Sequence, residues 1–432
     1  MARMLTAADI EAAGGKLILA AGDRLTPLAR DRARELGVVI EAAGSSSGAA
    51  APSAAPTSTS APVVKSPAAS PAPAPVSAAR PATPAPTAIA TGSRPLVLPP
   101  SGALYRRNAL RPSAQSSGAA DQRPKAGVVG AGHVGAMTAL RLAESDLFSE
   151  VALVDVVPGL AAGLALDMWH GAGLYGFSTL LSGSDDLVAL AGAEYIVITA
   201  GKPRQPGMSR TDLTAVNAEI MTSVCRGIRT YAPNSTLVIV SNPLEEMTHL
   251  AAQQTGFPEE RVLGMAGVLD SARFCALVGL TGKARPQEVR AIALGSHGPE
   301  MVIPLSQAFV SGRPIESMFD AGTLKALVER ARESGGEVVK LLQKGSAYFS
   351  PAESAVNMVR AMVRDSGEVI AACVRSRGAY GAVDTRVGLP VRLHRRGLKE
   401  IVPLTLRPAE QQALQEAAER IAARIAELPA AR

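Results

Sequence analysis

The segment at 130–135, Gly-Ala-Gly-His-Val-Gly, follows an apolar run at 126–129 and opens a helical pattern. In such a strand–turn–helix unit, the first glycine permits a tight turn and the second lets a phosphate approach the backbone. The third glycine lets the helix and the strand pack closely. The segment therefore predicts an α/β fold built on a doubly wound parallel sheet.

Further apolar runs occur at 151–155, 195–199 and 236–240, and they alternate with helical patterns. Short runs rich in Val, Ile and Leu are typical of parallel strands that are buried on both faces. From about 245 onward the pattern is more mixed, and it ends in a charged amphipathic helix at 408–428. We therefore expect a Rossmann domain at 124–266 and an α+β catalytic domain at 267–432, which share a cleft.

An acidic residue, Asp155, ends the predicted strand that follows the glycine-rich segment, about 20 residues beyond its last glycine. A carboxylate at this place accepts hydrogen bonds from a ribose diol and repels a 2′-phosphate. The pair of signals predicts a dinucleotide site that prefers NAD to NADP. A glycine-rich turn followed by a surface aspartate is the structural alternative.

Five residues further along the chain suggest acid–base chemistry on an anionic substrate: Arg204, Arg210, Asp270, Arg273 and His297. A His–Asp pair is the usual way to make a neutral imidazole of fixed tautomer into a general base. Guanidinium groups bind carboxylates in a two-pronged manner, and three of them are more than one carboxylate needs. The set predicts a substrate with two carboxylates. The structural alternative for each arginine is a surface ion pair.

The first 123 residues differ in composition from the rest. Residues 43–123 are rich in Ala, Pro and Ser and poor in large apolar side chains, so we predict a disordered linker there. Residues 1–42 carry helix signals at 7–13 and 27–36 and strand-like runs at 16–20 and 38–40. They predict a small N-terminal module that is too short to be stable alone and that docks on another surface.

Charge and cysteine content narrow the function classes. The formal net charge is +6, but eight basic residues and one acidic residue lie between positions 43 and 125. The rest of the chain is thus close to neutral, and we expect no nucleic-acid partner. The three cysteines are far apart and lack metal-ligand spacing, which predicts no disulfide framework, no metal site and a reducing cytosol. We expect neither a signal peptide nor a membrane span, because no apolar run approaches the roughly 18 residues needed.

From about 125 to 427 the chain resembles the malate dehydrogenases of the lactate-dehydrogenase-like group. The resemblance rests on motifs that occur in the same order along the chain. These motifs are Gly-Ala-Gly-His-Val-Gly, Ile-Thr-Ala-Gly-Lys-Pro-Arg-Gln-Pro-Gly-Met-Ser-Arg, Val-Ser-Asn-Pro-Leu, Val-Leu-Asp-Ser-Ala-Arg-Phe, Gly-Ser-His-Gly and Lys-Gly-Ser-Ala-Tyr-Phe-Ser-Pro-Ala. The N-terminal module is not part of the resemblance.

The resemblance implies a role for each residue that matches a motif. It makes His297 the proton acceptor and Asp270 its orienting partner, and it makes Arg273 the clamp for the C1 carboxylate. Arg204, on a closing loop, pairs with the distal carboxylate, and Arg210 polarises the reacting carbonyl. Asn242 hydrogen-bonds the substrate oxygen, although an Asn-Pro turn residue is the alternative. The implied cofactor-binding residues are Gly130, Ala131, Gly132, His133, Val134, Gly135, Asp155, Asn217, Val240, Ser241 and Asn242.

The resemblance further implies a reaction of the tricarboxylic acid cycle, the reversible transfer of a hydride between (S)-malate and NAD that gives oxaloacetate and NADH. It also implies a homodimer or homotetramer. Lactate dehydrogenases of the same fold have a glutamine where this chain has Arg204, which favours a dicarboxylate. The alternatives are a lactate or other 2-hydroxy acid dehydrogenase, and a non-catalytic scaffold that keeps the dehydrogenase body as a binding module.

Two segments of the chain depart from the family pattern. Pro299-Glu300 follows His297-Gly298, where the family usually has Asp-Thr, and Pro299 removes a backbone donor. We expect this change to affect the position or the pKa of the histidine, and so the turnover rate, but not the reaction type. His133 stands in the glycine-rich segment in place of a more common asparagine, and we interpret it as a tolerated variable position.

The motifs at 5–10 and 25–30 resemble the leading segments of ethanolamine-utilisation-type proteins and of other cargo of bacterial microcompartments. A docking module for a shell or scaffold protein is one interpretation of residues 1–42. A small accessory domain on its own enzyme and a vestigial fusion are the others. We expect a cytoplasmic protein, with the interior of a bacterial microcompartment as the more specific location.

Overall fold

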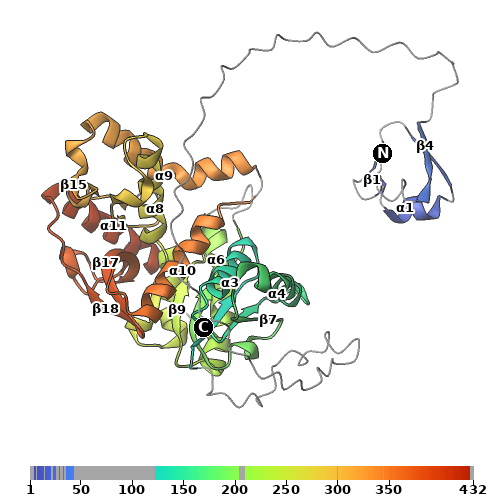
Figure 1. Cartoon of the computed structure of the whole chain (residues 1–432), viewed down its shortest axis with the longest axis horizontal. Coiled ribbons are helices and arrows are strands. Elements are labelled where there is room, and N and C mark those ends of the chain that lie inside the picture. The colour runs from blue at the N-terminus through green and yellow to red at the C-terminus, as the bar shows by residue number, and fades with distance from the viewer. Residues whose placement is uncertain are drawn as a thin grey trace, which may run out of the picture. The chain divides into compact units, whose positions relative to one another are not determined.

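The computed structural model describes residues 4–5, 7–13, 15–20, 23–25, 29, 33, 36–42, 122–203, 210–298, 300–343 and 345–428. The chain divides into two compact units, Met1–Ser101 and Gly102–Arg432 (Figure 1). Of the sequence predictions, the linker up to residue 121 and most of the second N-terminal helix lie outside the described residues. So do Arg204, Pro299 and the side chain of Arg210.

Within its described residues, the N-terminal unit contains two pairs of parallel strands. Strand β1 (Met4–Leu5) pairs with β3 (Arg24–Leu25), and β2 (Lys16–Leu19) pairs with β4 (Val39–Ala42). The helix α1 (Ala7–Ala12) contributes Ile10 to a core that also includes Ala29 and Ala33. Among the described residues, the partly buried Leu17 and Val38 pack against this core.

The second unit begins with a parallel sheet in the order β7-β6-β5-β8-β9-β10. Numbered along the chain, this is the order 3-2-1-4-5-6 of a doubly wound dinucleotide-binding sheet. The strands are β5 (Lys125–Val129), β6 (Glu150–Val154), β7 (Leu180–Ser184), β8 (Ala193–Ile198), β9 (Thr236–Ile239) and β10 (Val262–Gly264). The helices are α3 (His133–Glu144), α4 (Leu160–His170), α5 (Ala172–Tyr175), α6 (Arg210–Tyr231) and α7 (Leu244–Thr255).

The same sheet continues without a break into the C-terminal half of the unit. Strand β10 pairs antiparallel with β16, and β17, β18, β12 and β13 follow, which gives eleven strands within the described residues. These strands are β12 (Leu294–Gly295), β13 (Met301–Val302), β16 (Val369–Arg375), β17 (Arg386–His394) and β18 (Gly397–Ile401). A smaller sheet contains β11 (Val289–Arg290), β14 (Phe309–Val310) and β15 (Arg313–Pro314). The helices are α8 (Gly267–Leu280), α9 (Ala321–Leu342), α10 (Phe349–Arg364) and α11 (Pro408–Ala426).

Both faces of the parallel sheet are buried, as the apolar runs predicted. In β8, Tyr195 and Val197 belong to one apolar core, and Ile196 and Ile198 belong to another. Successive side chains of a strand point to opposite faces, so a strand with a core on each side needs apolar residues at every position. The first core includes side chains of α3 and α10, and the second includes side chains of α6 and α7.

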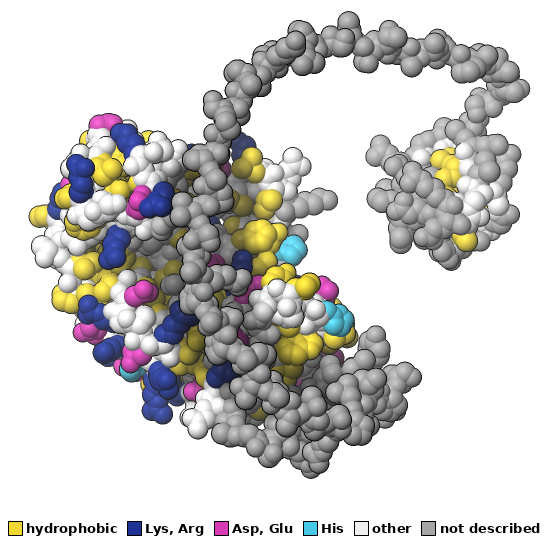
Figure 2. Space-filling model, in the orientation of Figure 1, with side chains coloured by type: hydrophobic (Ala, Val, Ile, Leu, Met, Phe, Trp, Pro, Cys, Tyr) yellow, Lys and Arg dark blue, Asp and Glu magenta, His cyan; other side chains and the backbone are white. Residues whose placement is uncertain are grey.

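Charged side chains of both signs are interspersed on the face of the larger unit that is shown in Figure 2. All three cysteines carry free thiols, and burial raises the pKa of Cys225 to about 12. Among the described residues, no helix is both long enough and apolar enough to cross a membrane.

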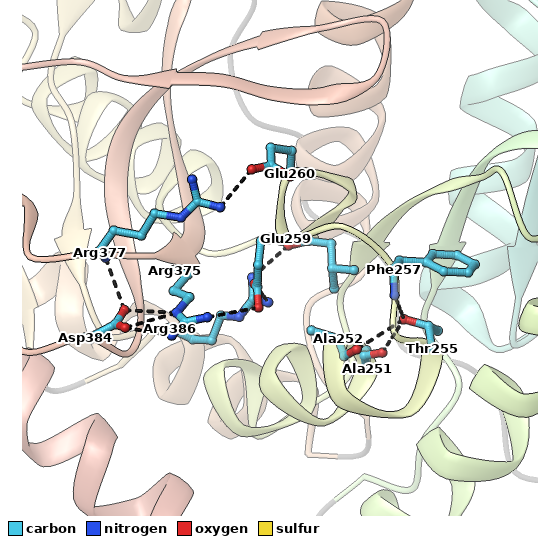
Figure 3. Close-up of polar contacts among 11 residues, drawn as sticks. Ala251, Ala252, Thr255, Phe257, Glu259, Glu260, Arg375, Arg377, Asp384 and Arg386 are labelled. Atoms are coloured by element: carbon cyan, nitrogen blue, oxygen red, sulfur yellow. Dashed lines mark hydrogen bonds and ion pairs between the residues drawn. The ribbon is translucent and has the colours of Figure 1, made fainter.

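A cluster of ion pairs connects the strands β16 and β17 to the 3₁₀ turn Glu259–Arg261, just before β10 (Figure 3). Arg386 is only 2% exposed, donates to the carbonyl oxygen of Val262 at 3.0 Å and pairs with Glu259. The neighbouring pair, Arg377 with Glu260, spans 2.7 Å but is largely exposed. A buried guanidinium depends on its carboxylate partner far more than an exposed one does.

We therefore expect the two neighbouring glutamates to differ in their effect on stability. Glu259→Gln should lower the free energy of unfolding by about 3 kcal/mol, because it removes the carboxylate that compensates a buried charge. Glu260→Gln is the matched control and should cost no more than about 1 kcal/mol. Urea unfolding followed by the fluorescence of Trp169, the only tryptophan of the chain, reports on this unit alone. Equal losses for the two variants would contradict the expectation.

Candidate active site

The glycine-rich segment forms a tight loop between β5 and α3. Gly130 has a φ of +102°, which favours glycine, and a Cβ at Gly135 would lie 1.7 Å from the carbonyl oxygen of Gly130. A Cβ at Gly132 would meet nothing within 4 Å. The first and third glycines therefore let the loop and helix fit together, whereas the second leaves open space. Because Gly132 provides no side-chain cap, the first turn of α3 presents N–H groups to an anion.

Asp155 follows β6 and is hydrogen-bonded to the glycine loop. Its Oδ2 accepts from the backbone N–H of Ala131 at 2.6 Å, and its Oδ1 accepts from that of Val157 at 2.9 Å. The sequence predicted a ribose acceptor at this position, and the structure adds that the carboxylate also holds the loop. A carboxylate can accept about four hydrogen bonds, so two further ones remain for a ligand diol.

Of three other residues that were predicted to line the cofactor site, Ser241 and Asn242 follow β9, and Asn217 lies on α6. Ser241 is buried and donates to the carbonyl oxygen of Ala200 at 2.6 Å. Asn217 on α6 donates to the carbonyl oxygens of Asn242 and Lys202 and accepts from the N–H of Lys202. Asn217 thus donates both amide hydrogens to backbone carbonyl oxygens, and it connects the loop after β8 with the loop after β9. The side chain of Asn242 is exposed at the start of α7.

His133 lies in the glycine loop with an exposed side chain. Its ring centroid is 5.1 Å from that of Tyr348, the residue that precedes α10. The remaining members of the predicted cofactor set differ in accessibility, since Ala131 is buried and Val134 and Val240 are half-buried.

The predicted acid–base residues come together around α8. Asp270 is 2% exposed, its Oδ2 lies 2.8 Å from Nδ1 of His297, and its Oδ1 accepts from Arg273 at 3.2 Å. A carboxylate can only accept, so Nδ1 carries the hydrogen and Nε2 is left as the acceptor. One buried carboxylate thus sets the tautomer of the histidine and holds the arginine one turn further along the same helix.

Packing between α8 and the strand segment before His297 brings these residues together. A Cβ at Gly267, the first residue of α8, would lie 2.2 Å from the carbonyl oxygen of Ala293. Ser271 then accepts a hydrogen bond from the backbone N–H of Ala293 at 2.9 Å. Gly298 follows the histidine with a φ of +144°, a conformation that L side chains rarely adopt. The helix and the turn therefore place His297 opposite Asp270.

Sequence reasoning did not identify Glu245, which is 2% exposed and accepts from the backbone N–H of His297 at 2.6 Å. The next residue, Glu246, pairs with Arg424 of α11, which also pairs with Glu300 at 2.9 Å. The available signal was the occurrence of two successive acids in a helix start that is otherwise apolar. The structural consequence of Pro299 lies outside the described residues, but its neighbour Glu300 is held by this ion pair.

The charges around His297 decide its basicity. Burial alone would lower the pKa of His297, but the charge and the hydrogen bond of Asp270, with a smaller contribution from Glu245, outweigh burial and raise it. Arg273 opposes them. The arrangement can therefore accept a proton at Nε2 next to a group that binds carboxylates. Among the described residues, no group of three or more His, Cys, Asp or Glu side chains is placed to hold a metal ion.

Known proteins match this chain over both halves of the larger unit. A model of the lactate/malate dehydrogenase NAD binding domain matches residues 124–264, and one of the lactate/malate dehydrogenase alpha/beta C-terminal domain matches 267–431. The chain is 43% identical over 294 residues to a malate dehydrogenase of Chloroherpeton thalassium, with 68% of this chain and 95% of that protein covered. A malate dehydrogenase of Trichormus variabilis is 40% identical over 299 residues, with coverages of 69% and 92%. The chain belongs to the lactate/malate dehydrogenase family.

Solved structures of the family include both kinds of enzyme. Malate dehydrogenase from Salinibacter ruber has a TM-score of 0.67 and 34% identity, and the match covers 70% of this chain and 96% of that chain. Lactate dehydrogenase from Cryptosporidium parvum, solved with lactic acid and the dinucleotide cofactor, has a TM-score of 0.68 and 31% identity, with coverages of 71% and 99%. Backbone similarity therefore does not distinguish malate from lactate, and the side chains that face the substrate must do so.

The titration of His297 can be measured directly. NMR of histidine labelled in the ring should show a pKa above the ordinary 6.5, so that the imidazolium persists to a higher pH than in a free histidine. Asp270→Asn should lower this pKa, because it removes the largest stabilising charge and leaves the cost of burial. Asp384→Asn, in the ion-pair cluster of Figure 3, should leave it unchanged. An unmoved pKa in Asp270→Asn would show that the hydrogen bond does not set the basicity.

Proposed function

We propose that this protein is an NAD-dependent malate dehydrogenase that interconverts (S)-malate and oxaloacetate. The observation that carries the proposal is the hydrogen bond of 2.8 Å between His297 and the buried Asp270, with Arg273 held by the same carboxylate. Oxidation of a 2-hydroxy acid needs a proton acceptor beside a group that binds a carboxylate, and this arrangement supplies both. The relatives described above, which match over almost their full length, are malate dehydrogenases.

The glycine loop and Asp155 fit NAD. The open space at Gly132 and the N–H groups at the start of α3 suit a pyrophosphate, and the Asp155 carboxylate suits an unmodified ribose diol. The same carboxylate would repel the additional phosphate of NADP. NAD, when bound, accepts the hydride that leaves C2 of the substrate.

His297 accepts the proton of the substrate hydroxyl at Nε2, because Nδ1 is engaged by Asp270. The imidazolium that forms lies against the buried carboxylate, which stabilises its charge. Oxidation of malate requires the neutral ring, so this direction slows as the pH falls through the raised pKa of His297. Reduction of oxaloacetate requires the protonated ring and slows as the pH rises through the same pKa.

We assign substrate binding to four residues: Arg273, Asn242, Arg204 and Arg210. Arg273 binds the C1 carboxylate, and the exposed amide of Asn242 bonds the reacting oxygen, which Arg210 polarises. Arg204 pairs with the distal carboxylate after its loop closes. Closure excludes water, which strengthens each of these charge interactions.

Arg204 is expected to decide between malate and lactate. A methyl group in place of the distal carboxylate leaves a buried guanidinium unpaired, at a cost of about 3–5 kcal/mol. We expect kcat/KM for oxaloacetate to exceed that for pyruvate by at least about a hundredfold, and Arg204→Gln should remove most of this preference. Arg313→Gln, in the small sheet, is the control. The readout is NADH absorbance.

Two outcomes of that assay would contradict the assignment. Equal turnover of pyruvate by the unmodified protein would favour a lactate or other 2-hydroxy acid dehydrogenase. A correctly folded protein that turns over neither acid would favour a non-catalytic scaffold.

We further propose that the enzyme is a cytoplasmic homodimer or homotetramer and that residues 1–42 dock on the shell or a scaffold protein of a bacterial microcompartment. Support for an oligomer comes from exposed apolar side chains that follow α4, such as Leu174, which is 93% exposed. Support for docking comes from the N-terminal unit, which is compact by itself and whose patterned part, residues 1–42, is too short to be stable alone. An oligomer would present several copies of the module, and multivalency would strengthen weak docking.

Deletion of residues 1–42 should separate these roles. The shortened protein should keep its malate activity, and light scattering should show the same oligomeric mass, because neither catalysis nor oligomerisation is assigned to residues 1–42. It should lose its localisation to microcompartments when it is imaged as a fluorescent fusion in cells that form them. A loss of catalysis would instead favour an accessory domain that packs on the enzyme.

A further inference from the structure

His297 is held at two points by two different buried carboxylates. Asp270 on α8 bonds the ring, and Glu245 on α7 accepts the backbone N–H of His297 at 2.6 Å. The second carboxylate comes from the NAD-binding half of the unit, 52 positions earlier in the chain. It therefore connects the histidine directly to the part of the molecule that carries the glycine loop.

A carboxylate at this position is costly. Glu245 is 2% exposed, and burial raises its pKa because the charged form loses its hydration. Removal of an ion from water costs several kcal/mol, and an apolar side chain would fill the same space without that cost. The first turn of α7 offsets part of the cost through the helix dipole, and the N–H of His297 offsets another part.

The segment that carries His297 is also held on both sides of the histidine by α11. Arg424 donates to Ser296, the preceding residue, at 3.4 Å, and pairs with Glu300 beyond the histidine at 2.9 Å. The same guanidinium pairs with Glu246, the neighbour of Glu245, at 3.0 Å. The strands on either side, β12 and β13, have two residues each, so backbone pairing alone provides little support for this segment.

We propose that Glu245 is a positioning residue for His297, which fixes the backbone of the histidine with a second buried carboxylate, and that Arg424 supports the same segment from the C-terminal helix. The proposal rests on the function proposed above. Neither residue was assigned a role by the sequence motifs.

Charged groups surround His297 and the segment that carries it. Asp270 and Arg273 on α8 and Glu245 on α7 act on the histidine itself, whereas Glu246, Arg424 and Glu300 pair with one another beside its segment. Burial lowers the pKa of His297, Asp270 raises it most strongly, Glu245 raises it further and Arg273 lowers it. Loss of the Glu245 charge should therefore lower the pKa of His297.

Two substitutions at Glu245 separate its charge from its hydrogen bond. Glu245→Gln keeps an oxygen that accepts from His297, so kcat at the pH optimum should change little, while the acidic limb of the pH profile for malate oxidation moves to lower pH. Glu245→Leu loses the acceptor as well, and kcat should fall about 10- to 100-fold because the base is misplaced. KM for NAD should change less than kcat in both variants, since the glycine loop that would hold the pyrophosphate lies on other elements.

Matched variants control for a loss of stability alone. Glu259→Gln removes a carboxylate from the ion-pair cluster of Figure 3 and should lower the melting temperature without moving the pH limb. Arg424→Met should lower kcat, whereas Arg420→Met, one turn earlier on α11 and paired with the outer side of Glu300, should not. If Glu245→Gln keeps the pH limb of the unmodified protein and Glu245→Leu changes only the melting temperature, Glu245 is a structural residue and the proposal is overturned.

The titration of His297 by NMR distinguishes failure of this proposal from failure of the proposed function. It needs no turnover, so it gives a result even if the unmodified protein oxidises neither malate nor lactate. A lower pKa of His297 in Glu245→Gln supports the positioning role in either case. An unchanged pKa overturns it, whatever the substrate.

Discussion

The buried carboxylate of Asp270 is the interaction on which the site depends. It is 2% exposed and has two partners, the imidazole of His297 and the guanidinium of Arg273. The first partner becomes positive only when it takes a proton, and the second is always positive. A single charge therefore sets the tautomer of the base, raises its basicity and aims the group that binds the substrate carboxylate. Removal of the carboxylate would leave the guanidinium of Arg273 without this partner, and the imidazolium of His297 would form without compensation.

The continuity of the sheet decides where that carboxylate lies relative to the cofactor loop. Gly264 at the end of β10 pairs with Cys373 of β16, so backbone hydrogen bonds join the parallel half to the antiparallel half. The helix α8 begins three residues after β10, and its first residue packs against Ala293 without room for a side chain. The glycine loop and the acid–base pair are therefore held at a fixed separation, because both are attached to the same continuous sheet. His297 alone lies on a weakly paired segment, and this segment has the additional carboxylate and arginine.

The sequence was sufficient for the parts of the fold and the site that depend on local patterns. The predicted strands at 126–129, 151–155, 195–199 and 236–240 agree with β5, β6, β8 and β9 to within two residues, because strands buried on both faces must be apolar at every position. Strand β7, Leu-Leu-Ser-Gly-Ser, was not predicted, because it has mixed composition at the edge of the sheet. The sequence predicted a His–Asp pair, and the structure places His297 and Arg273 within hydrogen-bond distance of the Asp270 carboxylate. Glu245 and Arg424 could not be found, because their partners are 52 and 178 positions away and the pairing leaves no local signature.

The charges beside the histidine also explain how a strong base and an anionic substrate can share one site. Asp270, Glu245, Glu246 and Glu300 would together repel a dicarboxylate if they acted through open solvent. Asp270, Glu245 and Glu246 are instead buried, and each charge is directed at a specific donor: Arg273, the backbone of His297 and Arg424. Their fields are thus largely compensated at a distance, while Asp270 and Glu245 still raise the pKa of the imidazole, where the proton arrives. The ring can therefore be made more basic without a net negative surface facing the substrate, because each added carboxylate has a positive or donating partner within hydrogen-bond distance.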